Sequence, residues 1–111
     1  MEHVPELEIR PDEGMAIAGD VVIPLSAREI DLLAAMAKRE NRVVRREDLY
    51  RIVWGQPLRA GDRSIDVYVH KLRVKLETAV PHARFIHTHV GFGYRYGAEL
   101  SHAFHNQATR P

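Results

Sequence analysis

The chain has 111 residues, enough for one domain with a modest core, and its 45% hydrophobic and 28% charged residues are typical of a folded globular protein. It contains no cysteine, which excludes disulfides, cysteine-ligated zinc and a cysteine nucleophile, and no apolar run approaches the ~20 residues of a membrane helix. The net charge of +1 is unevenly distributed, because residues 1–31 hold two basic and eight acidic side chains and the basic excess lies in residues 32–111. This asymmetry fits a polyanion bound on one side of the molecule, and a solvated charged surface explains it equally well. The acidic N-terminus lacks the apolar segment of a secretory signal, and we expect a cytoplasmic protein.

The first 25 residues have the pattern of short antiparallel strands. Leu7 and Ile9 alternate with charged residues, as in a strand with one buried face. Turn residues at 11–14 and 19–20 separate this segment from the apolar runs that follow each turn. We therefore predict a small antiparallel sheet, preceded by a linker or tail at residues 1–6.

A helix is predicted to begin after Ser26. Ser26 and Glu29 have the spacing of a capping box, in which each side chain accepts a hydrogen bond from the other residue's backbone N–H. Apolar residues then recur at helical spacing as far as Ala37, and Asn41 suits the left-handed conformation that ends a helix. The valine pair 43–44 is too short for more than a bridging strand.

Two further helices and a hairpin are predicted in the C-terminal half. Residues 46–53 carry an apolar stripe that ends at a tryptophan–glycine pair. A third helix is expected at 63–76, with Asp62 as its N-cap. Residues 85–96 are predicted to form a β-hairpin that turns at its glycines, and residues 98–111 a flexible tail.

The third predicted helix has two contrasting faces. Ile65, Val69, Leu72 and Leu76 fall in one narrow stripe, which is the expected core face. An amphipathic helix with a solvated basic face explains the cations of the opposite face but leaves two valines in water. A helix in the major groove of DNA explains both, because a valine methyl packs on a thymine methyl while cations contact phosphates. The opposite face consists of Arg63, Val67, His70, Lys71 and Val74.

The order of the predicted elements is that of a helix-turn-helix followed by a glycine-rich hairpin. The segments 25–33 (LSAREIDLL), 41–55, 62–76 and 86–96 (IHTHVGFGYRY) resemble the OmpR/PhoB-type winged-helix effector domain of two-component response regulators. The resemblance covers about residues 7–97. It implies an α+β fold with a four-stranded N-terminal sheet, three helices and a C-terminal hairpin called the wing. It also implies sequence-specific binding of duplex DNA, with helix 63–76 in the major groove, and so a bacterial response-regulator transcription factor of a two-component phosphorelay system.

The resemblance implies roles for individual residues. Arg63 and Trp54 would contact phosphates, Val67 would touch bases, and Lys71 would contact a base edge from the groove. Thr88 and Tyr94 would hold the wing on the sugar-phosphate backbone. The full DNA-binding set implied is Trp54, Arg63, Ser64, Val67, Tyr68, His70, Lys71, Arg73, Thr88 and Tyr94. The loop residues Gln56, Pro57, Leu58 and Arg59 match a segment that contacts RNA polymerase in some members of the family.

The sequence departs from the family pattern in two ways. The family wing usually contains Thr-Val-Arg-Gly, whereas here Thr88 is followed by His89, Val90 and Gly91, so the arginine that enters the minor groove is absent. The family also usually has an N-terminal receiver domain of ~120 residues, for which this chain has no room. We expect an excised effector domain that binds directly repeated DNA sites as a homodimer.

Other kinds of site receive less support. His87 and His89 share a strand face, and His102 and His105 have helical spacing, but no cysteine or carboxylate completes a metal site. No nucleophile lies beside a base and no paired carboxylates occupy a plausible pocket, so we predict no enzyme activity, catalytic residue, metal or cofactor. The alternative function is a winged-helix module for protein–protein contact, for example with RNA polymerase, which would depend on the apolar loop residues 57–58.

Overall fold

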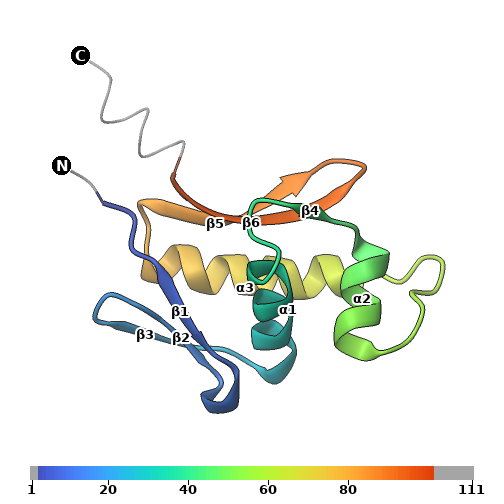
Figure 1. Cartoon of the computed structure of the whole chain (residues 1–111), viewed down its shortest axis with the longest axis horizontal. Coiled ribbons are helices and arrows are strands. Elements are labelled where there is room, and N and C mark those ends of the chain that lie inside the picture. Colours follow the sequence, from blue (N-terminus) through green and yellow to red (C-terminus); the bar gives the residue numbers. More distant parts are fainter. Residues whose placement is uncertain (1–2, 102–111) are drawn as a thin grey trace.

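The computed structural model describes residues 3–101, in which three α-helices lie with two small antiparallel sheets (Figure 1). Helix α3 runs across the centre of the molecule, with the N-terminal sheet below one end of it in the view of Figure 1 and the C-terminal hairpin above it. The elements in chain order are β1 (Leu7–Arg10), a 3-10 helix (Pro11–Glu13), β2 (Met15–Ala18), β3 (Val21–Pro24), α1 (Ala27–Ala37), β4 (Val43–Val44), α2 (Arg46–Trp54), α3 (Ser64–Ala79), β5 (Ala83–His89) and β6 (Gly93–Leu100).

The N-terminal sheet confirms the strands predicted from alternation and turns. Its order is β1-β2-β3, with Leu7 opposite Ala18 and Met15 opposite Pro24. Within residues 3–101 this sheet has three strands, so the four strands implied by the resemblance are a wrong expectation. The chain before the edge strand β1 contains Pro5, which has no backbone N–H to donate to a sheet.

Helix α1 begins as its capping box predicts. The Glu29 backbone N–H donates to Ser26 Oγ (3.3 Å), and the Ser26 backbone N–H donates to Glu29 Oε1 (2.8 Å). The helix ends at Ala37, and Asn41 then has the predicted positive φ of 66°. The apolar face that follows this cap packs into the core through Ile30 and Leu33, among others.

Helices α2 and α3 confirm the prediction of two further helices but shift their ends. Helix α2 extends to Trp54, and Gly55 closes it in the left-handed conformation (φ 73°). Helix α3 begins at Ser64 rather than at residue 63, and its N-cap is Arg63 and not the predicted Asp62. The Asp62 carboxylate accepts hydrogen bonds from Ser64 and so holds the turn that precedes the helix. Helix α3 continues three residues beyond the predicted end, to Ala79.

The C-terminal hairpin is longer than predicted. Strand β6 continues to Leu100 and pairs along its length with β5, and the Ser101 backbone N–H donates to the His82 carbonyl (2.9 Å). Residues 98–101 therefore belong to the folded domain and not to the predicted tail. Residues 102–111, with the histidine pair 102 and 105, and residues 1–2 of the predicted N-terminal tail lie outside the described residues.

The short strand β4 connects the helices to the hairpin. Val43 and Val44 pair with Arg95 and Tyr94 of β6, as a bridging strand should. Gly93 lies so close to β4 that an added Cβ would stand 2.1 Å from the Val44 carbonyl oxygen, and its φ of 153° also favours glycine. The hairpin is thus held against β4 at a fixed position beside α3.

One apolar core connects both sheets and all three helices. Its largest fully buried side chains include Phe85, Leu49 and Met36, which come from β5, α2 and α1. The ring of Phe85 is stacked on that of Tyr96 across the hairpin, with ring centroids 6.5 Å apart. In the part of the chain that the structure describes, no helix is both long and apolar enough to cross a membrane.

Candidate nucleic-acid interface

Helix α3 presents the two faces that its sequence predicts. Ile65, Val69, Leu72 and Leu76 are buried at 1% exposure or less. On the opposite side Val67 and Val74 are 48% and 51% exposed. The other members of that side, Arg63, His70 and Lys71, are exposed as well, and the Arg63 side chain is 79% exposed. The structure therefore leaves a mixed basic and apolar helix face open to solvent.

Asp66 connects one edge of this face to the hairpin and to α2. The Tyr94 hydroxyl donates to Asp66 Oδ1 (2.5 Å), and Arg46 Nη1 lies 3.3 Å from Oδ2 of the same carboxylate. Arg63 Nε lies 3.8 Å from Asp66 Oδ2. A single carboxylate thus holds side chains from α2, from the start of α3 and from β6 around the N-terminal half of α3.

Tyr94 differs from the role that the resemblance implied. It is only 7% exposed, and its hydroxyl is engaged with Asp66 rather than open to a phosphate. Burial, and then the hydrogen bond to Asp66 and its negative charge, raise the pKa of Tyr94 to about 12. In this structure Tyr94 positions the hairpin against α3.

A second contact joins α3 to the wing, which is the β5–β6 hairpin. Arg73 Nη1 donates to Thr88 Oγ1 (2.9 Å), and the Arg73 guanidinium carbon lies 5.9 Å from the centroid of the Tyr94 ring. Both Arg73 and Thr88 belong to the set expected to contact DNA. The structure brings them together at the junction of helix and wing, where Thr88 remains exposed.

The other edge of the α3 face is aromatic. The half-buried Trp54 ring stacks on Tyr50 (centroids 4.6 Å apart) and lies 5.7 Å from Tyr68 at a tilt of 53°. Arg28 covers this tryptophan from α1, with its guanidinium carbon 4.7 Å from the ring centroid. Lys71 Nζ lies 5.4 Å from the Tyr68 ring centroid, a cation–π distance. The exposed cations of α3 therefore lie between an aromatic edge and the wing.

Ser64 is occupied within the protein. Its backbone N–H and its hydroxyl both donate to Asp62 Oδ1, at 2.8 and 2.5 Å. These two hydrogen bonds hold the pKa of Asp62 below its ordinary value, because they stabilise the charged carboxylate. The arrangement favours a role for Ser64 in starting α3 over a role as a free donor to DNA.

Glu29 and Lys75 join α1 to α3 behind the exposed face. Glu29 is 2% exposed, and its Oε1 accepts a hydrogen bond from Lys75 Nζ at 2.7 Å. Burial alone would raise the pKa of Glu29, but hydrogen bonds from Lys75 and Ser26 outweigh it and hold that pKa below its ordinary value. The pair fixes α3 relative to the N-terminus of α1.

The loop between α2 and α3 lies beside the aromatic edge. Gln56, Pro57 and Arg59 are exposed, whereas Leu58 is half-buried. The Asp62 backbone N–H donates to the Arg59 carbonyl (3.1 Å) and closes the loop before α3 begins. The predicted polymerase-contact residues are thus largely accessible, at one end of the molecule beyond α2 (Figure 1).

The histidines of the hairpin have partners within the protein. His87 Nε2 lies 2.7 Å from the Gly97 carbonyl oxygen, and Arg95 Nε donates to His89 Nε2 at 3.1 Å. Across residues 3–101 no three histidine, aspartate or glutamate side chains gather in a group that could hold a metal ion.

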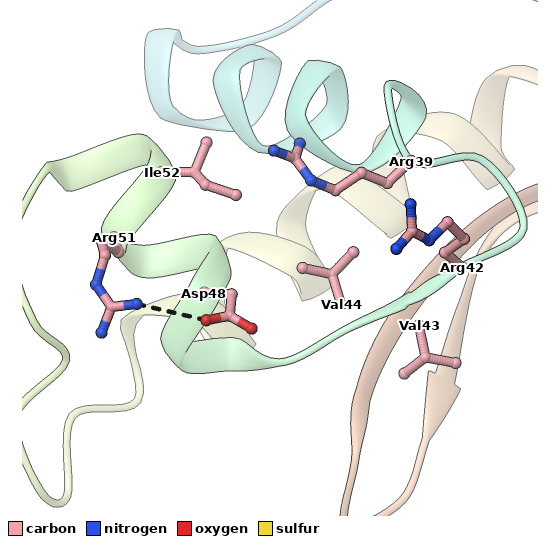
Figure 2. A pocket seen from close by; sticks show the side chains of 7 residues that line it. All are labelled: Arg39, Arg42, Val43, Val44, Asp48, Arg51 and Ile52. Carbon is pink, nitrogen blue, oxygen red and sulfur yellow. Dashed lines mark ion pairs between the residues drawn. The ribbon is translucent and has the colours of Figure 1, made fainter.

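A second basic surface lies away from α3. An open hollow of about 340 Å³ is lined by the turn after α1, by β4 and by α2, and Figure 2 shows the side chains around it. Three arginines line it, Arg39, Arg42 and Arg51. Arg51 Nη1 lies 3.5 Å from Asp48 Oδ1, and Arg39 Nη1 donates to the Ala35 carbonyl (2.8 Å). Reasoning from the sequence did not single out this hollow, because its arginines come from different elements.

Asp66, Arg46 and Arg28 are the site residues that the sequence analysis missed. Two of the Asp66 contacts come from residues 20 positions earlier and 28 positions later in the chain, and the contact with Arg63 has helical spacing. Arg46 lies in the first turn of α2, and its charge alone did not distinguish it from a solvated arginine. No local spacing in the sequence marks the contacts of Asp66 with Arg46 and Tyr94.

Comparison with protein families identifies related sequences over most of the domain. Residues 20–96 match the family model described as "Transcriptional regulatory protein, C terminal". The phosphate regulon transcriptional regulatory protein PhoB of Klebsiella pneumoniae is 34% identical over 94 residues, which are 85% of this chain and 41% of the relative. The transcriptional regulatory protein PrrA of Mycobacterium leprae is 36% identical over 91 residues, 82% of this chain and 39% of the relative. The chain therefore spans about two fifths of the length of these relatives.

Solved structures of similar fold include DNA-binding domains. The RstA DNA-binding domain of Klebsiella pneumoniae, solved in complex with the RstA box, has a TM-score of 0.73 and 26% identity and covers 86% of this chain and 95% of its own. The DNA-binding domain of CpxR from Escherichia coli has a TM-score of 0.72 and 29% identity, over 86% of this chain and 93% of its own.

Proposed function

The chain belongs to the family of C-terminal domains of transcriptional regulatory proteins, and from this premise we propose that it binds duplex DNA sequence-specifically as the effector domain of a response regulator. Its fold is the winged helix of DNA-binding domains from such regulators. In the proposed complex α3 lies in the major groove and the β5–β6 wing lies beside it.

The observation that carries this proposal is the exposed face of α3. A major groove about 12 Å wide admits one helix, and it offers base edges and thymine methyls at its floor with phosphates on both sides. The face that holds Val67, His70 and Lys71 presents apolar and cationic groups in that arrangement, between Arg63 at the helix start and the wing. A purely solvated helix face would leave two valines about half exposed to water, whereas thymine methyls in the groove would bury them.

We assign contacts to residues by their position on this surface. Arg63 and the aromatic edge at Trp54 lie where phosphates of the two strands would pass, so their contribution is to affinity on any sequence. Lys71 and Val67 lie at the centre of the face and would contact bases. His70 and Thr88 are exposed beside them, whereas Tyr68, Arg73, Ser64 and Tyr94 support these residues from within.

A selection from random duplex DNA at near-physiological salt tests the proposal. The expected result is enrichment of one short motif, with an affinity that falls steeply as salt rises, because each phosphate contact releases a counterion. Arg63→Ala should weaken binding to the selected duplex, whereas Arg42→Ala removes the same charge from the hollow of Figure 2 and should leave it unchanged. Failure to enrich any sequence would contradict sequence-specific binding.

The second candidate function is a protein–protein contact module. The arginine-lined hollow of Figure 2 supports it, because three arginines, one of them paired with Asp48, and three apolar side chains suit an acidic segment of a partner protein. In that case Arg42→Ala and Arg51→Ala would abolish partner binding, and Arg63→Ala would not. The two functions are compatible if DNA occupies α3 while a partner occupies the hollow.

The wider assembly forms part of the same proposal. We propose that in the cytoplasm the domain is joined to a receiver domain, binds direct repeats as a homodimer on DNA, and offers the loop 56–59 to RNA polymerase. The exposure of Gln56, Pro57 and Arg59 supports the last of these. Mutation of Pro57 and Arg59 to alanine should lower transcription from the selected site without lowering affinity for its DNA.

A further inference from the structure

The tip of the wing is uncharged and apolar. Val90 is 88% exposed and Phe92 is 75% exposed, higher fractions than those of the other large apolar side chains that the structure leaves exposed within residues 3–101. Single exposed apolar residues are common on protein surfaces. Here two of them share one tight turn, where the family pattern would place an arginine in the position of Val90.

The turn is held rigidly. The Phe92 backbone N–H donates to the His89 carbonyl (2.8 Å), and Gly91 supplies the positive φ (82°) that such a turn needs. Behind the turn, Gly93 fits closely against β4, and the Arg73–Thr88 hydrogen bond anchors the wing to α3. These contacts place the backbone of the turn at a defined position relative to the α3 face, with the phenyl ring exposed.

The surroundings of the tip indicate what covers it. Phe92 lines an open hollow together with Val43, His89, Gly91 and Arg45, which is the residue before α2. The Arg45 side chain is 69% exposed and its Nη2 lies 2.9 Å from Glu47 Oε2, so the apolar tip stands beside an exposed arginine that is paired with a carboxylate. The apolar tip and the exposed arginine together are complementary to one edge of duplex DNA, where a charged phosphate chain borders the sugar faces of a groove. It is also continuous with the proposed α3 interface.

Major and minor grooves alternate along one side of a duplex. A rigid wing beside a helix in the major groove therefore passes over a phosphate chain and meets the neighbouring minor groove. Apolar side chains, phenylalanine among them, enter minor grooves as wedges between base steps, whereas cations respond to the negative potential of narrow grooves. Val90 and Phe92 are suited to the first of these mechanisms and not to the second.

We propose that Phe92, supported by Val90, is an apolar wedge that enters the minor groove next to the α3 site. There it adds a preference for base steps that unstack easily. This inference rests on the proposed DNA-binding function. Because an apolar contact releases no counterion, the contribution of Phe92 is independent of salt, in contrast to that of an arginine.

The experiment measures the affinity of the chain for its selected duplex by fluorescence anisotropy at about 50 and about 200 mM salt. Phe92→Ala should weaken binding about tenfold at both salt concentrations, since a phenyl ring loses its burial. Leu100→Ala is the control, because Leu100 is 39% exposed at the end of β6 away from the turn at residues 89–92, and it should have no effect. Thermal unfolding of Phe92→Ala should match that of the parent chain, since the ring makes no contribution to the core.

A second duplex localises the contact. Removing the base pairs under the wing should weaken binding of the parent chain to the level of Phe92→Ala and leave the variant unchanged. Replacing guanine by inosine in that flank removes the amino group from the minor groove alone, and should change the affinity of the parent chain but not of the variant.

Two outcomes separate the inference from the function on which it rests. If the parent chain binds its site and Phe92→Ala binds equally well, or responds to inosine as the parent does, the wedge is wrong and DNA binding stands. If the parent chain prefers no sequence at all, both proposals fail.

Discussion

Asp66 illustrates how single residues organise the interface. Its carboxylate faces the wing and α2 rather than solvent, and it accepts the Tyr94 hydroxyl while pairing with Arg46. The negative charge of Asp66 offsets part of the positive charge of this surface. Asp66 therefore contributes by holding its neighbours in position and not by attracting a polyanion. Lys71 is the contrasting case, because it is exposed and pairs with no carboxylate in the described part of the chain.

At the residue scale, Lys71→Ala and Arg63→Ala should have different effects. Lys71→Ala is expected to reduce discrimination between the selected site and mismatched duplexes by about 1–3 kcal/mol, because a base contact is lost. Arg63→Ala should weaken all duplexes alike and lower the salt dependence. Competition titrations with specific and random DNA measure both effects. Equal losses of both variants on both DNAs would show that Lys71 contacts no base.

Tyr94→Phe tests whether this tyrosine positions the wing or contacts DNA. The structure places its hydroxyl on Asp66, so the variant should lose about 1 kcal/mol of folding stability in thermal or denaturant unfolding. A direct DNA contact predicts the reverse, namely unchanged stability and weaker binding in proportion to one lost phosphate contact.

At the scale of elements, α3 is fixed at three places along its length. Its start is set by Asp62 and Ser64, its first turn is joined to β6 by Asp66 and Tyr94, and its C-terminal half is joined to α1 by the Glu29–Lys75 pair. The last two contacts join α3 to different elements. The exposed face therefore has a defined orientation relative to both α1 and the wing.

Glu29→Gln should expose the contribution of the α1–α3 contact. The pKa of Glu29 is below its ordinary value of 4.5 in the folded protein, so the charged carboxylate stabilises the fold above that value. That stability is lost as pH falls through the lower folded pKa. Near neutral pH the variant should be less stable by about 1–3 kcal/mol, because the buried hydrogen bonds to a charged group are weakened.

Unfolding curves of Glu29→Gln, measured from neutral to acid pH, test this prediction. The difference in stability from the parent chain should shrink as pH falls below the ordinary value of 4.5 and through the lower folded pKa, since the parent then protonates the same group. Asp31→Asn is a suitable control, as Asp31 is exposed on the same helix. If the difference in stability between variant and parent stays constant across the acid range, the effect does not come from the titration of Glu29.

At the scale of the whole molecule, charge is unevenly distributed along an elongated domain. The N-terminal sheet and the first turn of α1 lie within residues 3–31, which have an acidic excess, whereas most of the exposed arginines and lysines lie in residues 38–75. In Figure 1 the sheet and the wing tip lie at opposite ends of the elongated domain. With this distribution of charge, head-to-tail placement on DNA brings the acidic sheet of one copy towards the basic helices of the next.

Binding to tandem sites is the corresponding prediction. A duplex with two direct half-sites about 10 bp apart should bind two copies more tightly than a single half-site binds one, and inserting about 5 bp should remove the gain by rotating one copy to the other side. Band-shift titrations with one, two and displaced half-sites measure this. Independent occupancy of the two half-sites at both spacings would rule out contact between copies.

Much of the fold follows from local chemistry and was predictable. The capping box at Ser26, the left-handed Asn41, the stripe of α3 and the glycine hairpin each depend on residues within a few positions of one another, and all appear in the structure. The errors are at boundaries and pairings. The end of β6 depends on contacts with distant residues, and the N-terminal sheet was over-counted by a strand because that number came from the resemblance alone.

The candidate site was likewise predictable only in part. The sequence by itself determined which helix carries the basic face and which of its residues are exposed, because helical periodicity sorts a helix into faces without knowledge of the rest of the chain. Only the tertiary structure decided that Tyr94 and Ser64 are engaged internally, that Asp66 joins α2 and the wing, and that Phe92 is exposed at a rigid tip. These facts depend on contacts between residues far apart in the chain, and such contacts are set by packing of the whole core rather than by spacing along the sequence.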